Sequence, residues 1–225
     1  MDRLLNQRTY ENLKKDIMTF GLMPGEPVSA AKIARRYRVS RTPAREALVM
    51  LQGEGLVDIF PQSRSVISKI NVRRIRQEWF VRRTLELAMV DEFFESVKKE
   101  DIEEMKHYAK LLETVGAEPE TPENAYKYLE YDNLFHAVVY RASREELAAL
   151  VIEKSMSHYN RARLMIDMDS ARKERTTRDH ARLIKLLEAE DREGYREVLG
   201  IHLSYIEADI REMNRNRPDM FEMEE

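Results

Sequence analysis

The stretch from 40 to 48, SRTPAREAL, places a helix start inside a cluster of positive charge. Thr42 is a good N-cap, and Pro43 then falls in the first helical turn, where a missing amide hydrogen costs no hydrogen bond. Because proline helps to fix where the helix begins, it also fixes where Arg41 and Arg45 point. A helix of this kind is typical of a helix-turn-helix when a second helix precedes it after a tight connection.

Two helices are predicted on the N-terminal side of this start. Ser29 can cap a short helix, AAKIARRYR, whose Ile33 and Tyr37 take inward positions. Residues 8–20 carry apolar side chains at helical spacing, and the Gly- and Pro-containing stretch GLMPGEPVS separates the two helices. The sequence therefore predicts helix, short helix, tight turn and helix, in that order.

Two short strands are predicted after the third helix. The segments LVDIF and SVISKI alternate between apolar and polar residues on either side of PQSR, a pattern typical of a hairpin. In a winged helix-turn-helix the third helix enters the major groove of DNA by its N-terminal end. We therefore expect a winged helix-turn-helix DNA-binding domain, with a two-stranded wing, over residues 1–70.

The distribution of charge agrees with this expectation. The whole chain carries a net charge of −3, but residues 1–70 hold 12 Lys and Arg against 7 Asp and Glu. The basic N-terminal part is therefore followed by an acidic remainder, which is typical of a chain whose first part meets a polyanion. A basic helix alone is more often an ordinary solvated face, but here helix order, hairpin and charge agree.

These residues resemble the DNA-binding domain of the GntR family of bacterial transcription regulators. The resemblance rests on PGEPVS, KIARRYRVSRTPAREAL and GLV, within residues 24–57. It implies a homodimer that represses or activates transcription at a palindromic operator in double-stranded DNA. It also implies DNA contacts from Arg35, Arg41 and Arg45, with further contacts from Thr42 and the wing tip.

The wing tip departs from the family pattern. The family tends to have an Arg-Gly pair there, whereas Ser63 and Arg64 stand at the aligned positions. A tip without glycine can follow a different path, but Arg64 can still reach a phosphate or a narrow minor groove. We therefore expect a DNA contact from Arg64 and leave the geometry of the wing tip open.

The chain from 71 to 225 is predicted to be an all-helical bundle, which makes the fold mainly α. Only 7 glycines and 7 prolines occur in 225 residues, so a β-meander with many tight turns is not expected. The predicted helices are 72–97, 100–114, 123–142, 145–166, 170–189 and 191–213. The final NRPDMFEMEE is predicted to be a frayed acidic tail.

Composition excludes several classes of function. The chain has no cysteine, so disulfides, thiolate zinc sites, cysteine-held iron–sulfur clusters and cysteine nucleophiles are excluded. No apolar run approaches the roughly 18 residues of a membrane span, and MDRLLNQRTY is not a signal peptide. We therefore expect a cytoplasmic protein without membrane contact, in which any metal is held by histidine and carboxylate.

Four polar residues at inward positions of the predicted helices could form a metal site. Asp132 and His136 are four residues apart, so they share one face of a helix with apolar neighbours. His180 and His202 occupy inward positions on two later helices. Each taken alone is more often a hydrogen-bonded core residue than a ligand. If the four converge, three imidazoles and a carboxylate suit zinc, nickel or manganese.

The order of these groups resembles the FCD effector domain of the FadR-type subfamily of GntR regulators. The matching pieces are VRRTLE, DNLFH, the His180 helix with its trailing EAED, and IHL. The resemblance implies a helical bundle with a central divalent metal bound by Asp132, His136, His180 and His202. It implies further that this domain, residues 71–225, holds the dimer together. It also implies a small carboxylate effector at the open positions of the metal, and the metal histidines argue against acyl-CoA.

Arginines are the candidates for meeting an effector carboxylate. Arg82 matches a family position near the cavity, but it could equally form a salt bridge with Glu86 one helical turn later. Arg161 and Arg163 are further candidates. Two histidines outside the pattern are interpreted as ordinary residues: His107 and His158.

The sequence thus favours a sequence-specific transcription regulator whose operator affinity is controlled by a small organic acid at a metal site. A metal with open positions could instead activate water in a hydrolytic enzyme. We do not predict an enzyme, because no general base is marked by spacing and the basic N-terminal part would have no role. A purely structural metal that stiffens the bundle is the third alternative. The effector, the operator and the metal's identity are left open.

Overall fold

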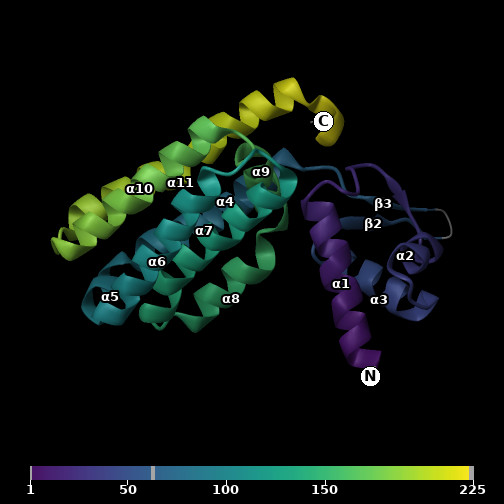
Figure 1. The fold of residues 1–225 in the computed structure, drawn as a ribbon, viewed down its shortest axis with the longest axis horizontal. Helices are drawn as coiled ribbons and strands as arrows, with labels where there is room; N and C mark the ends of the chain where they lie inside the picture. Colours follow the sequence, from purple (N-terminus) through teal and green to yellow (C-terminus); the bar gives the residue numbers. More distant parts are fainter. Residues whose placement is uncertain (1, 62–63, 223–225) are drawn as a thin grey trace. The chain divides into compact units, whose positions relative to one another are not determined.

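The computed structural model describes residues 2–61 and 64–222, which form two compact units (Figure 1). One unit holds the residues up to Val72 together with the stretch from Asn214 onward, and the other is Arg73–Met213. Helices dominate both units, and the sheet is confined to the first. The predicted mainly α fold, with a winged helix-turn-helix before a helical bundle, is confirmed.

The helix-turn-helix is built around α3. The elements of the N-terminal unit are α1 (Asp2–Met18), β1 (Pro27–Val28), α2 (Ala30–Tyr37), α3 (Arg41–Gly53), β2 (Val57–Ile59), β3 (Ser65–Ile67) and η1 (Pro218–Met220). Both α1 and α2 pack on α3. Their facing apolar side chains, Leu13, Ile33 and Leu51, are fully buried. This small core holds the outer face of α3 toward solvent.

The start of α3 differs from the prediction by two residues. The N-cap is Ser40, which has extended backbone angles, and Thr42 lies within the first turn with its side chain exposed. Pro43 is buried in that same turn. The first amide groups of a helix have no intrahelical acceptor, so proline can follow the cap by three positions as easily as by one. The sequence alone could not distinguish these two starts.

The wing contains a third strand that the sequence did not predict. The hairpin of β2 and β3 is confirmed, and β1 pairs antiparallel with β3, so the strand order is β1-β3-β2. Pro27 lies opposite Val66 in this pairing. A proline cannot donate a ladder hydrogen bond, but it is tolerated on an edge strand such as β1. The prolines that suggested an irregular segment therefore also permit this short strand.

The end of the chain is ordered against the N-terminal unit. The amide of Ile70 donates to the Met220 carbonyl (2.9 Å), and the amide of Glu222 donates to the Ile70 carbonyl (3.0 Å). Met220 and Phe221 are almost completely buried. The prediction of a frayed tail is therefore wrong for the described residues 216–222. Two apolar side chains decide the outcome, because their burial outweighs the acidic character of the segment.

Phe221 offers a test of this docking. The conservative Phe221→Leu substitution is expected to lower the free energy of unfolding by roughly 1 kcal/mol, because leucine fills the buried site incompletely. Urea denaturation followed by circular dichroism measures the change. Phe60→Leu, at a side chain that is 46% exposed, is the matched control and is expected to alter stability by less than about 0.5 kcal/mol. An equal effect of the two substitutions would contradict the docked tail.

The second unit is a bundle of eight helices within the described residues. They are α4 (Val72–Ala88), α5 (Val90–Ser96), α6 (Lys99–Gly116), α7 (Pro122–Ala142), α8 (Glu146–Ser155), α9 (Ser157–Ile166), α10 (Ser170–Glu188) and α11 (Arg192–Asn216). Two predicted helices are each divided, one at Met89 and one at Met156. Neither position has a glycine or proline, so no local signal in the sequence marks these breaks.

The helix α7 lies at the centre of the bundle, where it packs against α5, α6, α8 and α9. Its start is well defined, because the Thr121 hydroxyl accepts a hydrogen bond from the amide of Asn124 and Pro122 occupies the first turn. This central helix carries Asp132 and His136. Within the described residues, no helix combines the length and the apolar character that a membrane crossing requires.

Candidate metal centre and DNA-reading surface

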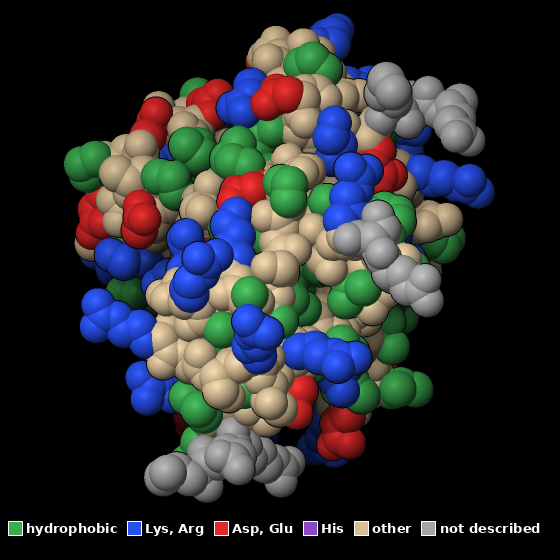
Figure 2. Space-filling view, turned by 90° about the vertical axis from the view of Figure 1, so that its right-hand side faces the viewer, with side chains coloured by type: hydrophobic (Ala, Val, Ile, Leu, Met, Phe, Trp, Pro, Cys, Tyr) green, Lys and Arg blue, Asp and Glu red, His purple; other side chains and the backbone are tan. Residues whose placement is uncertain are grey.

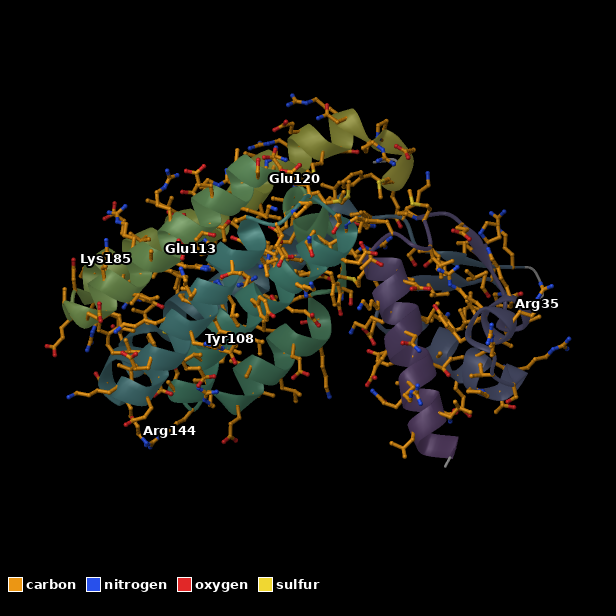
Figure 3. All side chains as sticks on the ribbon, in the orientation of Figure 1. Arg35, Tyr108, Glu113, Glu120, Arg144 and Lys185 are labelled. Atoms are coloured by element: carbon orange, nitrogen blue, oxygen red, sulfur yellow. The ribbon has the colours of Figure 1, made fainter. Side chains whose placement is uncertain are left out.

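Three of the predicted DNA-contacting arginines face solvent. Arg35 on α2 and Arg41 and Arg45 on α3 are exposed, and none has an ion-pair partner among the described residues. Figure 3 shows the Arg35 side chain directed away from the unit. By contrast, Arg36 is held within the unit, because its Nε lies 2.6 Å from Oδ2 of Asp16. The unit therefore leaves part of its arginine cluster available to a polyanion.

The exposed side of α3 also forms a shallow hollow of about 640 Å³. Its lining residues are Arg41, Thr42, Arg45, Glu46, Val49 and Met50. Figure 2, which views the molecule from the side of α2 and α3, shows Lys and Arg side chains grouped across the visible face. The first turn of α3 thus combines cationic side chains with free backbone amides, a combination suited to phosphate.

The wing and the turn supply two further arginines. Arg64 is exposed, and its guanidinium carbon lies 5.7 Å from the centre of the Phe60 ring. Ser63, which together with Arg64 stands where the family has an Arg-Gly pair, lies outside the described residues. Arg38 ends α2 in a left-handed conformation and is exposed between α2 and α3. Sequence reasoning did not select Arg38, although its place in the turn of the helix-turn-helix was a usable signal.

The four candidate metal ligands meet inside the second unit. Asp132 and His136 come from α7, His180 from α10 and His202 from α11. One potential ligand atom from each lies within 4.8 Å of all the others. Asp132, His136 and His180 are at most 1% exposed, whereas His202 is partly accessible. His107 and His158 do not belong to this cluster.

Hydrogen bonding around the cluster leaves the inner atoms without partners. His136 Nδ1 lies 2.8 Å from Oε2 of Glu86, so its Nε2 is the nitrogen left for another contact. The atoms of Asp132, His136 and His180 without a hydrogen bond are Asp132 Oδ1, His136 Nε2 and both ring nitrogens of His180. A buried polar atom without a partner costs about 1–3 kcal/mol. Several such atoms in one place fit a bound cation better than an empty core.

Electrostatics keep the cluster in the protonation states that a metal requires. Burial lowers the pKa of His180 well below its usual value, and burial likewise lowers that of His136, so both imidazoles are neutral near pH 7. Burial alone would raise the pKa of Asp132, but the charge of Arg163 holds it well below its usual range. One ionised carboxylate and neutral imidazoles are suitable ligands for a divalent ion.

Arginines lie against the carboxylates of this cluster. Arg163 donates one hydrogen bond to Asp132 and another to Asn133 Oδ1 (2.7 Å). Arg82 forms the salt bridge that the sequence left open, with Nε 2.5 Å from Oε1 of Glu86, and its Nη2 is 3.9 Å from Oδ2 of Asp132. Arg161 is completely buried on α9.

A small cavity of about 50 Å³ lies beside the cluster. Its wall includes Asp132, His202 and three arginines, Arg82, Arg163 and Arg175. Arg161 is not part of this wall. Sequence reasoning missed Arg175. This residue lies on α10, and its guanidinium carbon is 3.9 Å from the centre of the Tyr205 ring on α11. Sequence reasoning also did not predict that Glu86 contacts His136, although it had identified Glu86 as a possible i,i+4 partner of Arg82.

Together, these features define a class of protein: a helix-turn-helix regulator whose second unit holds a buried polar site. Comparison with known families places the chain within that class. Residues 5–67 match the model described as "Bacterial regulatory proteins, gntR family", and residues 79–205 match the FCD domain. The chain belongs to the GntR family and carries an FCD domain. It is therefore a transcriptional regulator and not an enzyme.

Individual relatives agree with this assignment. The HTH-type transcriptional repressor RspR of Escherichia coli (strain K12) is 26% identical over 220 residues, which are 98% of this chain and 95% of the relative. The gluconate operon transcriptional repressor of Bacillus subtilis (strain 168) is 30% identical over 136 residues, 60% of this chain and 54% of that protein. Among solved structures, E. coli McbR/YncC matches with a TM-score of 0.76 at 21% identity, covering 93% and 99% of the two chains.

Proposed function

We propose that this regulator binds its operator as a homodimer and that a small organic acid, bound beside a divalent metal, controls operator affinity. One observation carries the proposal. Unpartnered polar atoms of Asp132, His136 and His180 converge with His202 beside a cavity with three arginines in its wall. Such a site offers both a place for a cation and a complementary surface for a carboxylate.

The metal is proposed to be zinc, nickel or manganese, since these ions accept three imidazoles and a carboxylate. When bound, it would offer open coordination positions to an effector oxygen. The chain's own residues orient the ligands: Glu86 accepts from His136, Tyr140 and Arg82, and so fixes the His136 ring. Oδ2 of Asp179 lies 3.6 Å from Nδ1 of His202, so a second carboxylate stands beside an imidazole of the cluster.

The cavity favours a small acidic effector. A water molecule occupies roughly 30 Å³ in the liquid, so the cavity of about 50 Å³ has room for a group the size of a carboxylate. Arg82, Arg163 and Arg175 supply the positive charge. Since guanidinium groups bind carboxylates through paired hydrogen bonds, a bound acid can compete with Asp132 and Glu86 for these arginines. That exchange is a local change through which the effector can alter the bundle.

The N-terminal unit is proposed to read a palindromic operator in double-stranded DNA. Arg35, Arg41, Arg45 and Arg64, with Thr42, are the proposed contacts, because they are exposed and the first turn of α3 presents its amides to the same surface. The effector shifts operator affinity if it binds the DNA-competent and DNA-incompetent states with different strengths. A metal with a purely structural role is the competing proposal.

The proposal is tested by titrating operator DNA, selected from genomic fragments at a fixed salt concentration, with protein in three states. The states are metal-loaded, chelator-stripped and reloaded protein, each with and without acetate, lactate, malonate or citrate. One of these acids is expected to change operator affinity by about 5- to 150-fold in the metal-containing states only. If stripping lowers the melting temperature while no acid changes affinity in any state, the metal is structural and the sensor proposal fails.

Glu86 provides a test of how the metal site is held. Glu86→Gln keeps the shape of the side chain but removes the negative charge that interacts with His136 and Arg82. Metal affinity is expected to fall by about 10- to 100-fold, as it does when the partner of a metal-binding histidine is lost. Competition with a chromophoric chelator measures the affinity. Glu153→Gln, on the exposed side of α8, is the control and is expected to have no effect. Equal affinities in the two variants would contradict the proposed site.

A further inference from the structure

Two apolar side chains are exposed on the outer face of α3. Val49 and Met50 are 53% and 44% exposed. A single exposed apolar residue is common on protein surfaces and needs no explanation. These two, however, lie in the hollow of α3 beside Arg41 and Arg45, the arginines that are proposed to contact DNA. Their place relative to those arginines therefore determines what they can touch.

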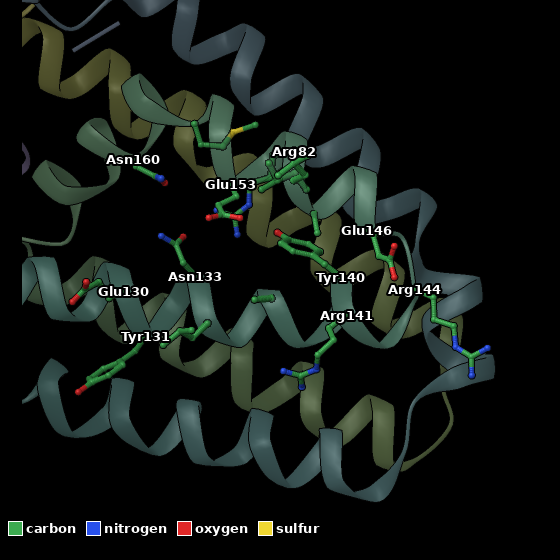
Figure 4. A pocket seen from close by; sticks show the side chains of 16 residues that line it. Arg82, Glu130, Tyr131, Asn133, Tyr140, Arg141, Arg144, Glu146, Glu153 and Asn160 are labelled. Carbon is green, nitrogen blue, oxygen red and sulfur yellow. The ribbon is translucent and has the colours of Figure 1, made fainter. Parts of the chain in front are cut away.

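Exposed apolar side chains of the second unit have different surroundings. Leu134 and Leu150, which are 42% and 43% exposed, line a groove of about 870 Å³ along α7 and α8 together with further apolar side chains (Figure 4). Val49 and Met50 instead share their hollow with two arginines, a threonine and a glutamate. The surface around them therefore suits a polar, charged partner that also carries a small apolar group.

Helical spacing places Val49 at the centre of the exposed face of α3. Thr42, Arg45 and Val49 are spaced i, i+3 and i+7, so they lie along one face of the helix. Met50 lies about 100° further round the helix, at the Glu46 edge of this face. The opposite face of the helix is buried in the core of the unit and consists of Ala44, Ala47, Leu48 and Leu51.

The acidic side chain of the hollow is engaged by α1. Glu46 accepts a hydrogen bond from the side-chain amide of Asn6. Arg45, on the other side of Val49, is exposed and has no ion-pair partner among the described residues. The face therefore presents an apolar centre beside an available cation, while its carboxylate is bound at the edge that faces α1.

We propose that Val49 reads a thymine of the operator by contact with the methyl group of that base. Thymine presents this methyl group in the major groove, where apolar side chains recognise it. A β-branched side chain has one strongly preferred rotamer in a helix, so Val49 loses little freedom when it makes the contact. The inference rests on the proposed reading of DNA by α3, to which it adds a base that a guanidinium group does not recognise.

The position of the thymine follows from the geometry of the two helices. Val49 lies four residues after Arg45, which is a rise of about 6 Å along the α-helix. Successive bases of one DNA strand are about 3.4 Å apart. The thymine is therefore expected within about two base-pair steps of the base whose recognition depends on Arg45.

Deoxyuridine tests the contact, because it differs from thymidine only by the absence of the methyl group. Each thymine of the selected operator is replaced in turn, in both halves of a palindrome, and fluorescence anisotropy measures the affinity of the full-length protein. Replacement at one position is expected to weaken wild-type binding by about 3- to 10-fold, because a methyl-sized apolar contact is lost. In Val49→Ala the same replacement is expected to have no further effect, since the contact is already absent.

Salt dependence separates this contact from an effect on the phosphates. A methyl contact releases no counterions, so the ratio of the affinities for the thymine and deoxyuridine operators is expected to be the same at every salt concentration. A scrambled duplex is expected to bind the wild type equally with thymine or deoxyuridine, because nonspecific binding depends on the phosphates.

Two variants serve as matched controls. Met50→Ala removes an apolar side chain of similar exposure from the edge of the same hollow, and Val151→Ala removes a valine that is 39% exposed on α8. Both variants are expected to retain the full deoxyuridine effect. Alanine favours the helix at all three exposed sites, and circular dichroism checks that the variants remain folded.

The inference is wrong if no deoxyuridine position distinguishes the wild type from Val49→Ala, or if Met50→Ala abolishes the deoxyuridine effect instead. A wild type that binds the operator and the scrambled duplex equally would remove the proposed reading of DNA, and the thymine contact with it. That result differs from the first two, because those leave sequence-specific binding intact.

Discussion

Replacing His180 by alanine is expected to remove the bound metal. His180 is completely buried, both of its ring nitrogens lack hydrogen-bond partners, and its Nε2 lies 3.4 Å from Oδ1 of Asp132. Loss of one of four ligands should weaken binding by about 100-fold or more, at least as much as the loss of a residue that only orients a ligand. Metal analysis of the purified protein after dialysis against a weak chelator measures the retained ion.

His107→Ala is the matched control, since His107 is exposed on α6 and lies outside the cluster. It should retain the metal content of the wild type. The His180 variant should also lose its response to the effector acid while it keeps operator affinity in the absence of acid. Stoichiometric metal in the His180→Ala protein would show that the ligand set is wrong, whatever the effect on operator binding.

Replacing Arg45 by alanine is expected to weaken operator binding by about 1–3 kcal/mol if Arg45 contacts a base edge. Arg45 is exposed on the first turns of α3, lines the hollow of that helix, and has no partner to lose within the described chain. The substitution should therefore leave stability almost unchanged. Fluorescence anisotropy with the selected operator and a scrambled duplex, each at several salt concentrations, separates base contacts from phosphate contacts.

A base contact reduces affinity for the operator more than for the scrambled duplex, whereas a phosphate contact weakens both and lowers the salt dependence. Arg182→Ala is the control, because Arg182 is an exposed arginine of α10 without a partner among the described residues. This substitution removes the same charge from the other unit, and it should leave the affinity for both duplexes unchanged. Unaltered binding by the Arg45 variant would remove this residue from the reading surface.

Local sequence signals predicted most of the bundle, but not its breaks. Thr121 and Pro122 indicate the start of α7 from the sequence alone. A capping hydroxyl and a first-turn proline affect only the few residues next to them, so their effect can be predicted locally. Met89 and Met156 interrupt helices with no such sign. Methionine is compatible with a helix, so these breaks depend on how the neighbouring helices pack and not on local preference.

The candidate metal site was predictable in its residues but not in its surroundings. Asp132 and His136 share a helical face by spacing alone, and the family resemblance adds His180 and His202. The partners Glu86, Asp179 and Arg175 come from α4 and α10, and their distances to the cluster depend on side-chain packing across helices. No periodicity within one helix can encode such a distance, which is why sequence reasoning missed Arg175.

Spacing, caps and charge are local properties, so they are enough to specify the helical bundle, the helix-turn-helix order and the basic N-terminal part. Contacts between distant segments place β1 in the wing and bring Phe221 back to the N-terminal unit. Each of these depends on apolar area or backbone hydrogen bonds shared between segments far apart in the chain. Such contacts form only when the segments meet, so the chain's local patterns cannot specify them.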